Sequence, residues 1–307
     1  MFFCSERRFG VEIEYNAIDG SSKSSDIDGL PCGIYMFADV VKDAINKNVE
    51  VNKWHSTNNN KNWIVKPDSS CGLEICSPPN YSLEGIKEVE NVIDGISNKK
   101  HFESDSRCSL HVHVEIDDFN YSQILFLIQS WVQYEPVFFL MARKDRLFNN
   151  YCKPISFCFD FFLNDLRNSS LIYESICENK YFAINLCSYK KKKKKTIEFR
   201  IMGSDGCISS SVCSAWCKIL LSFVSSCKKK CDIVHFMNDI NYKSISQFEK
   251  FIEIDTNFPN FDFKKWFCDR IKIVDTFAKN KSVNILWEKI FNIYKFEFDK
   301  LNWREND

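Results

Sequence analysis

FGVEIE at residues 9–14 carries the clearest strand pattern of the chain. Together with Tyr15 it alternates apolar and charged side chains, which is the period of a β-strand with one face on a core. In such a strand Glu12 and Glu14 lie on one face, while Ile13 points to the other. A lone Glu-x-Glu pattern usually marks only a solvated face, so its meaning depends on the rest of the chain.

Three further segments show the same strand-like arrangement of functional side chains. They are Gly72–Cys76 with Glu74, Leu110–Ile116 with His111 and His113, and Thr196–Met202 with Glu198 and Arg200. If all four strands share one sheet, one of its faces carries four carboxylates and an imidazole, from Glu12, Glu14, Glu74, His111 and Glu198. Carboxylates so close together repel one another and stay ionised only beside cations. Oxygen ligands with one imidazole predict bound Mg²⁺ or Mn²⁺.

The His-x-His pattern also occurs in metal oxygenases built on a cupin-like barrel. That class needs a carboxylate a few residues after the second His and another His downstream on a strand. Here Glu115 comes too soon, and His235 lies in a stretch with helical periodicity. The sequence therefore disfavours an oxygenase.

The composition limits the partners of the chain. Its 307 residues are 45% hydrophobic, which is enough for a large buried core. Lys+Arg and Asp+Glu are balanced at 41 each, so no global field favours nucleic acid or a membrane surface. The lysine run Lys190–Lys195 predicts a solvated hairpin tip, and a nucleic-acid role for it is disfavoured.

The cellular compartment is predicted to be the cytoplasm. The first residues lack a secretory signal, and the apolar run Ile124–Met141 contains Glu135 and Pro136, which favours a buried helix over a membrane span. Fifteen cysteines scattered without CxxC pairs fit a reducing compartment better than a disulfide framework. Richness in Phe, Asn, Lys and Ile is typical of an AT-rich genome, such as that of a phage or virus.

The predicted fold class is α+β, with a curved, largely antiparallel sheet and flanking helices. Strands are expected at residues 9–15, 63–65, 72–76, 110–116, 181–188 and 196–202. Helices are expected at residues 34–46, 82–96, 122–143, 210–227, 244–254, 263–278 and 283–298. We expect a catalytic domain over residues 1–208 and a helical C-terminal extension over residues 209–307, packed on the same core.

The motifs, taken in order, resemble the amidoligase family of the carboxylate–amine ligase superfamily. The matching stretches are FGVEIE at 9–14, VKPDSSCGLEICSPP at 65–79, LHVHVE at 110–115, RLFNNYCKP at 146–154, YFAINL at 181–186 and TIEFRIMGS at 196–204. Members of that superfamily are similar to glutamine synthetase and glutamate–cysteine ligase in their catalytic sheet. The resemblance thus implies a glutamine synthetase-like catalytic fold.

The resemblance also implies roles for individual residues. One metal would be shared by Glu12, His111 and Glu198, and a second by Glu14 and Glu74, whose third carboxylate is left open among Glu84, Glu103 and Glu115. Glu198, Arg200 and His113 would be catalytic, with Arg200 facing the transferring phosphoryl group or the substrate carboxylate. Arg143, Arg146 and Asp68 are the candidate cofactor-binding residues, and Arg146 could also grip a substrate carboxylate.

The implied reaction forms an amide bond with ATP and two divalent ions, Mg²⁺ or Mn²⁺. ATP would phosphorylate a substrate carboxylate, and an amine would attack the resulting acyl phosphate. The acid and the amine are not specified, and a macromolecular acceptor (a protein, a cell-wall fragment or a modified base) stays open, as does the oligomeric state. The alternative is a degenerate ligase fold that serves as a binding or structural module.

The sequence departs from the family pattern at three places. Asp68-Ser69-Ser70 stands where Asp-Gly-Ser is usual, Gly203-Ser204 stands where Gly-Thr is commoner, and Lys190–Lys195 lengthens a short hairpin. None of these departures removes an expected metal ligand. Retention of all five expected ligands argues against the degenerate alternative.

Overall fold

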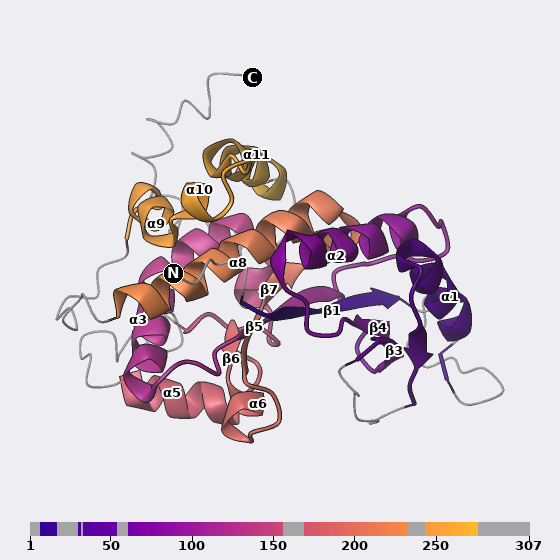
Figure 1. Cartoon of the computed structure of the whole chain (residues 1–307), viewed down its shortest axis with the longest axis horizontal. Helices are drawn as coiled ribbons and strands as arrows, with labels where there is room; N and C mark the ends of the chain where they lie inside the picture. The colour runs from indigo at the N-terminus through magenta and orange to yellow at the C-terminus, as the bar shows by residue number, and fades with distance from the viewer. Residues whose placement is uncertain are drawn as a thin grey trace. The chain divides into compact units, whose positions relative to one another are not determined.

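The computed structural model describes residues 7–16, 30–31, 33–53, 61–155, 169–231 and 243–275 (Figure 1). The chain divides into two compact units. Unit 1 comprises residues 1–114 and 202–218, and unit 2 comprises residues 115–201 and 219–307. The predicted division at residue 208 into a catalytic domain and a helical extension stays a prediction.

Five strands form the framework of unit 1. They are β1 (Phe9–Asn16), β2 (Val49–Val51), β3 (Trp63–Asp68), β4 (Gly72–Cys76) and β5 (Ser109–Glu115), in the order β2-β3-β4-β1-β5. Every pairing among them is antiparallel except β2 with β3, which is parallel. The sequence predicted four of these strands; β2 was missed because three residues are too few for a periodic signal.

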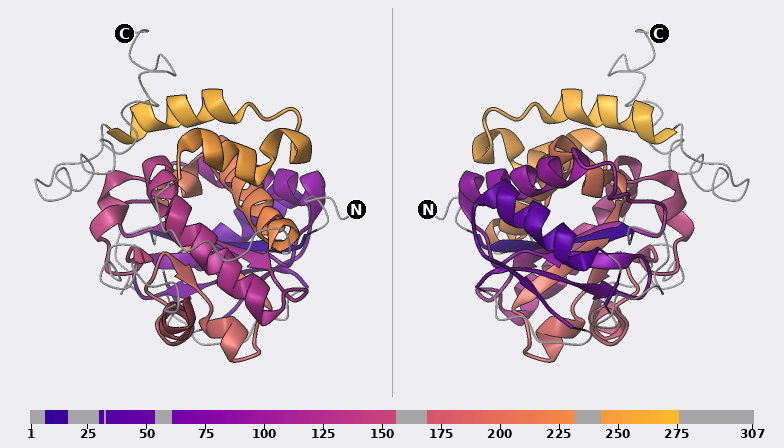
Figure 2. Two further views of the ribbon diagram at one scale, coloured as in Figure 1. Left: turned by 90° about the vertical axis from the view of Figure 1, so that its left-hand side faces the viewer. Right: turned by 90° about the vertical axis from the view of Figure 1, so that its right-hand side faces the viewer.

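The two faces of β1 differ as the alternation predicts. Val11, Ile13 and Tyr15 are almost fully buried, and the ring of Tyr15 lies 5.2 Å from that of Phe37, centroid to centroid. Phe37 belongs to α1 (Ile34–Ile45), which packs with α2 (Ser82–Ser97) in the same unit (Figure 2). Because the apolar face of β1 is covered in this way, Glu12 lies on the opposite face.

Unit 2 combines a short strand pair with most of the helices. Its elements are α3 (Tyr121–Met141), η2 (Lys144–Phe148), α5 (Ser169–Glu178), β6 (Ile184–Asn185), α6 (Cys187–Lys190), β7 (Thr196–Gly203), α8 (Ser210–Lys230), α9 (Ile245–Ile252), α10 (Ile254–Asn257) and α11 (Phe263–Asp275). Strands β6 and β7 pair antiparallel. Unit 1 also includes the last two residues of β7, 202–203, and the first part of α8, residues 210–218. Helix α7 (Asp205–Ile208) lies between them in the same unit.

Aromatic side chains form the core of unit 2. The rings of Trp131 and Phe138 from α3 stack with centroids 4.3 Å apart, and Phe199 of β7 lies 5.3 Å from Trp131. Phe223 of α8 meets Phe138 edge to face at 5.1 Å. Since Phe199 points into this core, its strand neighbours on either side face the other way.

Helices α3 and α8 are the two described helices that are long and apolar enough to cross a membrane. In the most apolar 18-residue window, 83% of α3 and 72% of α8 are buried within the protein. Packing inside the protein therefore accounts for their composition. The prediction of a buried helix over the run that ends at Met141 is confirmed.

The predicted α+β class is confirmed, with seven strands whose described pairings are antiparallel in all but one case. The predicted strand at 181–188 is largely wrong. Only Ile184–Asn185 is a strand, because the Asn185 side chain accepts a hydrogen bond from the backbone N–H of Cys187 at 2.7 Å and α6 begins there. The predicted helix at 283–298 lies outside the described residues.

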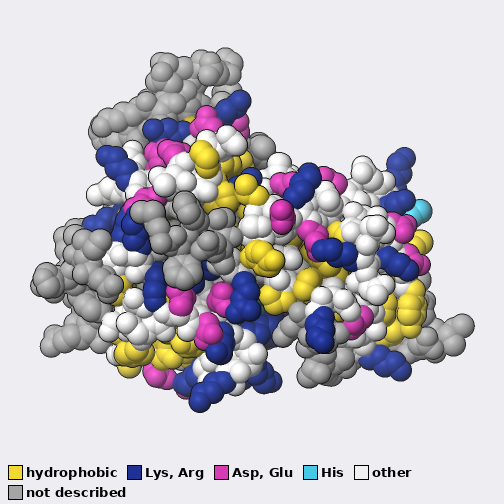
Figure 3. Space-filling view, viewed as in Figure 1, with side chains coloured by type: hydrophobic (Ala, Val, Ile, Leu, Met, Phe, Trp, Pro, Cys, Tyr) yellow, Lys and Arg dark blue, Asp and Glu magenta, His cyan; other side chains and the backbone are white. Residues whose placement is uncertain are grey.

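The lysine run lies at the surface as predicted, but it starts at the end of α6 rather than at a hairpin tip. Lys190 ends α6 and its Nζ lies 2.7 Å from Glu174 Oε2. Lys195 Nζ lies 2.7 Å from Asp117 Oδ1. Over the described surface in Figure 3 positive and negative side chains are interspersed, in line with the balanced charge of the chain.

Candidate functional site

The polar face of unit 1 gathers the predicted ligands on three adjacent strands. In the β1–β4 pairing Glu14 lies opposite Glu74 and Glu12 lies opposite Cys76. In the β1–β5 pairing Glu12 lies opposite His111. Because residues two apart in a strand share a face, these side chains and His113 project to the same side of the sheet.

Two imidazoles from β5 surround Glu12. His113 Nε2 lies 3.0 Å from Glu12 Oε1, and His111 Nδ1 lies 3.6 Å from Glu12 Oε2. Both histidines are buried, while the Glu12 side chain keeps 16% of its surface exposed. Glu12 is therefore the most accessible carboxylate of the cluster and the one closest to imidazole nitrogens.

Glu14 is buried and held by Ser109. The backbone N–H and the hydroxyl of Ser109 both donate to Glu14 Oε2 at 2.8 Å, and the same hydroxyl lies 2.9 Å from His111 Nε2. Burial, reinforced by the charges of Asp68 and Glu74, raises the pKa of Glu14 to about 8. Without a cation nearby, Glu14 therefore tends to hold a proton at neutral pH.

Glu74 has one ammonium and one thiol at the same oxygen. Lys66 Nζ lies 3.0 Å from Glu74 Oε1, and the Cys76 thiol donates to this oxygen at 3.0 Å. Burial, together with the charge of Glu12, raises the pKa of Glu74 even though Lys66 acts in the opposite direction. Burial and the two carboxylates also raise the pKa of the Cys76 thiol. One lysine thus only partly compensates the negative charge at this place.

Glu12, Glu74 and Cys76 form a compact group of potential ligands. One ligand atom from each lies within 4.8 Å of the other two. This group differs from the predicted pair of Glu14 and Glu74, whose third carboxylate, among Glu84, Glu103 and Glu115, stays a prediction.

Asp68 shapes the turn between β3 and β4. Its Oδ1 accepts hydrogen bonds from the backbone N–H groups of Ser70, at 2.7 Å, and of Cys71, at 3.3 Å. Burial works to raise the pKa of Asp68, but the hydrogen bonds from Ser70 and Cys71 outweigh it and lower the pKa overall. The side chain therefore stabilises the turn, and its predicted cofactor-binding role stays a prediction.

Glu198 and Arg200 pair with each other on β7 in unit 2. Arg200 Nη1 donates to Glu198 Oε1, and Arg200 Nε donates to the carbonyl of Tyr151 at 3.2 Å. Asn185, opposite Glu198 in the β6–β7 pairing, donates to Glu198 Oε2 at 2.6 Å. Both oxygens of Glu198 are thus held in place by residues of its own unit.

Arg146 and Arg143 differ in their surroundings. Arg146 is 3% exposed, and its guanidinium donates to the backbone carbonyls of Ile201 at 3.2 Å and Arg200 at 2.9 Å. Arg143 instead makes a bidentate salt bridge with Asp145: its Nε donates to Oδ1 at 3.1 Å and its Nη2 to Oδ2 at 3.0 Å. These bonds favour a positioning role for Arg146 beside β7.

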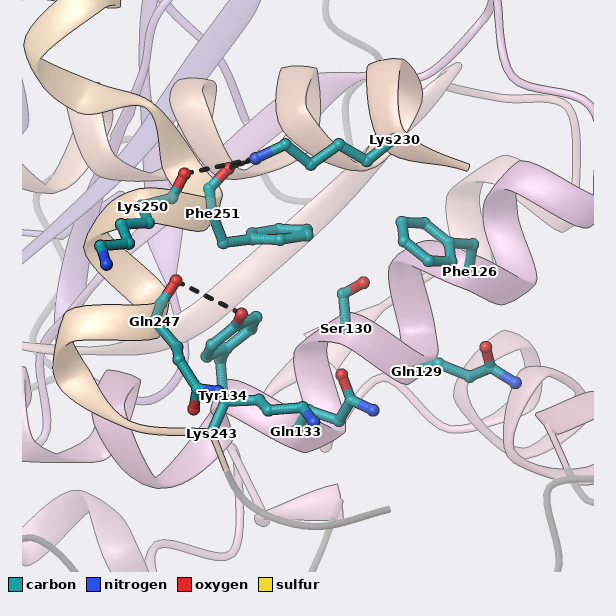
Figure 4. A pocket seen from close by; sticks show the side chains of 10 residues that line it. All are labelled: Phe126, Gln129, Ser130, Gln133, Tyr134, Lys230, Lys243, Gln247, Lys250 and Phe251. Carbon is teal, nitrogen blue, oxygen red and sulfur yellow. Dashed lines mark hydrogen bonds between the residues drawn. The ribbon is translucent and has the colours of Figure 1, made fainter. Parts of the chain in front are cut away.

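A pocket of about 350 Å³ in unit 2 has a different chemistry (Figure 4). Three lysines line it, and Lys230 Nζ donates to the carbonyls of Phe251 at 2.6 Å and Lys250 at 3.3 Å. Figure 4 shows the Tyr134 hydroxyl directed at the Gln247 carbonyl, 3.5 Å away. Its described lining holds no carboxylate, imidazole or thiol, so it lacks the donors of a metal site.

Seven of the ten predicted site residues fall into two sets. The structure brings five of them together in unit 1: Glu12, Glu14, Glu74, His111 and His113. It brings Glu198 and Arg200 together in unit 2. Sequence reasoning missed the residues that hold these groups: Lys66, Cys76, Ser109 and Asn185. Only the cross-strand register identifies Lys66 and Asn185, since each lies directly opposite a predicted carboxylate.

Comparison with known proteins supplies the family. A family model described as "Putative amidoligase enzyme" matches residues 5–224. No curated protein matches the chain. A solved structure described as "Crystal structure of novel glutamine synthase homolog" is 9% identical, with a TM-score of 0.48, over 92% of this chain and 70% of that one. Because the family model spans more than half of the sequence, and in agreement with the motifs, the chain belongs to the amidoligase family.

Proposed function

We propose that this amidoligase is an ATP- and divalent-metal-dependent carboxylate–amine ligase that forms an amide through an acyl phosphate. The observation that carries the proposal is the buried set of carboxylates and imidazoles on the polar face of unit 1, centred on Glu12. Family membership gives this set a chemical context, since an amidoligase joins a carboxylate to an amine.

The donor set fits divalent cations. It offers carboxylate oxygens and imidazole nitrogens, which suit Mg²⁺ and Mn²⁺. Burial and neighbouring carboxylates raise the pKa of both Glu14 and Glu74, so ionising both groups at neutral pH requires added positive charge. Lys66 is close to only one of these two carboxylates, at 3.0 Å from Glu74 Oε1. A divalent ion would supply the missing charge.

Different residues would bind the metal ions, position the ligands and contact the phosphoryl group. Bound divalent ions would neutralise the phosphate oxygens of ATP as charge builds on them. Glu12 and His113 would hold one such ion, and Ser109 would keep Glu14 and His111 in position. From the family motifs we propose that Glu198 and Arg200 act in the same reaction, Glu198 as a ligand and Arg200 on the phosphoryl group.

The test is ATP turnover in the presence of pooled acids and amines, with mass spectrometry for a new amide. We expect ADP, phosphate and an amide that all require Mg²⁺ or Mn²⁺, and loss of all three in Glu12→Gln and Glu198→Ala. Glu90→Gln is the matched control, because Glu90 lies on α2, where its carboxylate pairs with Lys87 at 3.1 Å, and it is not one of the candidate ligands. Full turnover in Glu12→Gln would overturn the proposal.

The degenerate alternative makes a different prediction in the same assay. A binding or structural module would bind divalent ions and produce neither ADP nor an amide from any pool. As further parts of the proposal, the enzyme works in the cytoplasm, away from a membrane, and joins one carboxylate substrate to one amine. The amine is carried by a small molecule or a macromolecule, which the mass of the product would distinguish.

A further inference from the structure

The pocket of unit 2 that Figure 4 shows lies between three helices. Phe126, Ser130 and Tyr134 line it from α3, Phe251 from α9 and Lys230 from the end of α8. Its volume of about 350 Å³ lies at the lower end of the range of small-molecule sites, about 300–1,000 Å³. The pocket therefore has room for a small ligand, whose class depends on the lining.

Ser130 carries a buried hydroxyl that points into the pocket. The residue is 3% exposed, and none of the described residues forms a hydrogen bond with this hydroxyl. Figure 4 shows it directed into the space between the rings of Phe126 and Phe251. A hydroxyl with so little exposure has few hydrogen bonds to water, so a ligand that bonds to it is favoured.

Aromatic side chains flank this hydroxyl. The rings of Tyr134 and Phe251 lie 5.1 Å apart, centroid to centroid, and Lys230 Nζ lies 4.9 Å from the centroid of the Phe251 ring. Phe126 lies on the other side of the Ser130 hydroxyl in Figure 4. Aromatic walls of this kind stack planar rings such as nucleobases. The space between Phe126 and Phe251 thus suits a flat ring better than an aliphatic chain.

Three amide side chains belong to the same lining. Gln129 and Gln133 lie about one turn apart on α3, and Gln247 lies on α9. An amide both donates and accepts hydrogen bonds, as the edge of a nucleobase does. A pocket for a purely apolar ligand would gain nothing from these groups. The lining therefore favours a ring with polar edges.

The charge of the lining is positive, and its charged residues are Lys230, Lys243 and Lys250. Lys230 shares the Glu253 carboxylate with Lys229, at 3.2 and 2.7 Å, so one acid faces two ammonium groups. Glu249 pairs instead with Lys264, at 3.5 Å. Ammonium groups in such excess attract an anion, and lysine is a regular partner of phosphate.

We propose that this pocket of unit 2 binds a mononucleotide. The base would lie between Phe126 and Phe251 with an edge on the Ser130 hydroxyl, and the phosphate would lie toward the lysines. Binding makes and breaks no covalent bond. The proposal goes beyond the ligase function, because the described lining holds no carboxylate, imidazole or thiol for a divalent ion. Binding should therefore need no metal.

The test is isothermal titration calorimetry of the full chain with AMP, GMP, CMP and UMP in the presence of a chelator. We expect at least one of them to bind at one equivalent. Its nucleoside, which lacks the phosphate, and ribose 5-phosphate, which lacks the base, should each bind about tenfold or more weakly.

Ser130→Ala separates binding from folding. It should lower the affinity for the mononucleotide by about two- to tenfold, the worth of one hydrogen bond. The melting temperature of ligand-free protein should not fall, because alanine favours a helix and no partner of the hydroxyl is lost. Ser226→Ala is the matched control, since Ser226 is a buried serine of α8 in unit 2 outside the lining.

Lys243→Gln and Lys250→Gln test the place of the phosphate. Each should weaken binding of the mononucleotide and leave that of the nucleoside unchanged. Lys265→Gln is the control, because Lys265 is exposed on α11 and does not line the pocket.

Three results would overturn the proposal. The first is no binding of any of the four mononucleotides to wild-type protein shown to be folded by circular dichroism. The second is equal affinity in Ser130→Ala and wild type. The third is binding that appears only with Mg²⁺ and disappears in Glu12→Gln, which would assign the nucleotide to the proposed metal site and support the ligase function instead.

Discussion

Glu14 lies directly opposite Glu74 in the antiparallel pairing of β1 and β4, and both carboxyl groups are buried. Two carboxylates in such an arrangement repel each other unless protons or cations intervene. The pair therefore lowers the stability of the metal-free protein. Such an unfavourable arrangement is typical of a site organised for a ligand rather than for the fold alone.

The pH dependence of stability should report this conflict. The pKa of Glu14 is raised from 4.5 to about 8 in the folded state, so between these values the unfolded chain loses a proton that the folded chain keeps. We expect the melting temperature of metal-free protein to fall from pH 5 to pH 8 and to level off above that. Glu14→Gln should flatten the fall, and Glu90→Gln, which changes a carboxylate on α2 that pairs with Lys87, should leave it unchanged.

The measurement for that prediction is differential scanning calorimetry in the presence of a chelator. A stability that is constant over this pH range, or that falls equally in Glu14→Gln, would show that Glu14 does not carry the unfavourable charge.

Arg200 should be needed for chemistry more than for folding. It pairs with Glu198 and donates to the carbonyl of Tyr151, contacts that a lysine can partly replace. A lysine cannot reproduce two parallel bonds to a phosphoryl group. We predict that Arg200→Lys keeps the melting temperature within a few degrees but lowers turnover about a hundredfold or more, comparable to the loss of one transition-state donor.

Steady-state turnover and a thermal melt of the same preparation test this prediction. Arg107→Lys is the control, because Arg107 also pairs with a carboxylate, that of Asp105, at 2.9 Å. Near-normal turnover in Arg200→Lys would make Arg200 a structural residue.

Arg146 should show the opposite pattern. Its guanidinium donates to the buried carbonyls of Ile201 and Arg200, and each acceptor left without a partner costs about 1–3 kcal/mol. Arg146→Met should therefore lower the free energy of unfolding by about 2–4 kcal/mol, measured by urea denaturation. A variant of unchanged stability with a raised KM for the acid would instead support the substrate-gripping role predicted from the motifs.

The alternation of side chains predicted the central strands because a period of two is a local property. Glu12, Ile13 and Glu14 needed no knowledge of their neighbours to be assigned to opposite faces. The same local pattern placed Phe199 in the core and Glu198 and Arg200 on the other face.

Register and local turns could not be predicted in this way. Lys66 meets Glu74 only because the Asp68 turn sets the β3–β4 pairing. The resemblance implied that Glu12 shares a metal with His111, which stays a prediction; it did not reveal that His113 lies nearer to Glu12, at 3.0 Å against 3.6 Å for His111. These side-chain contacts depend on how strands distant in sequence pair and on how each imidazole ring is oriented. Neither can be predicted from the pattern of a single segment.

The polar face of unit 1 is proposed to bind divalent metal, and anomalous diffraction from Mn²⁺-soaked crystals would locate the ion. We expect a manganese peak within about 2.0–2.4 Å of a Glu12 oxygen, with Glu74 or His113 completing its coordination. An absence of manganese at Glu12, with ions only on exposed surface carboxylates and Lys66 still paired to Glu74, would contradict it.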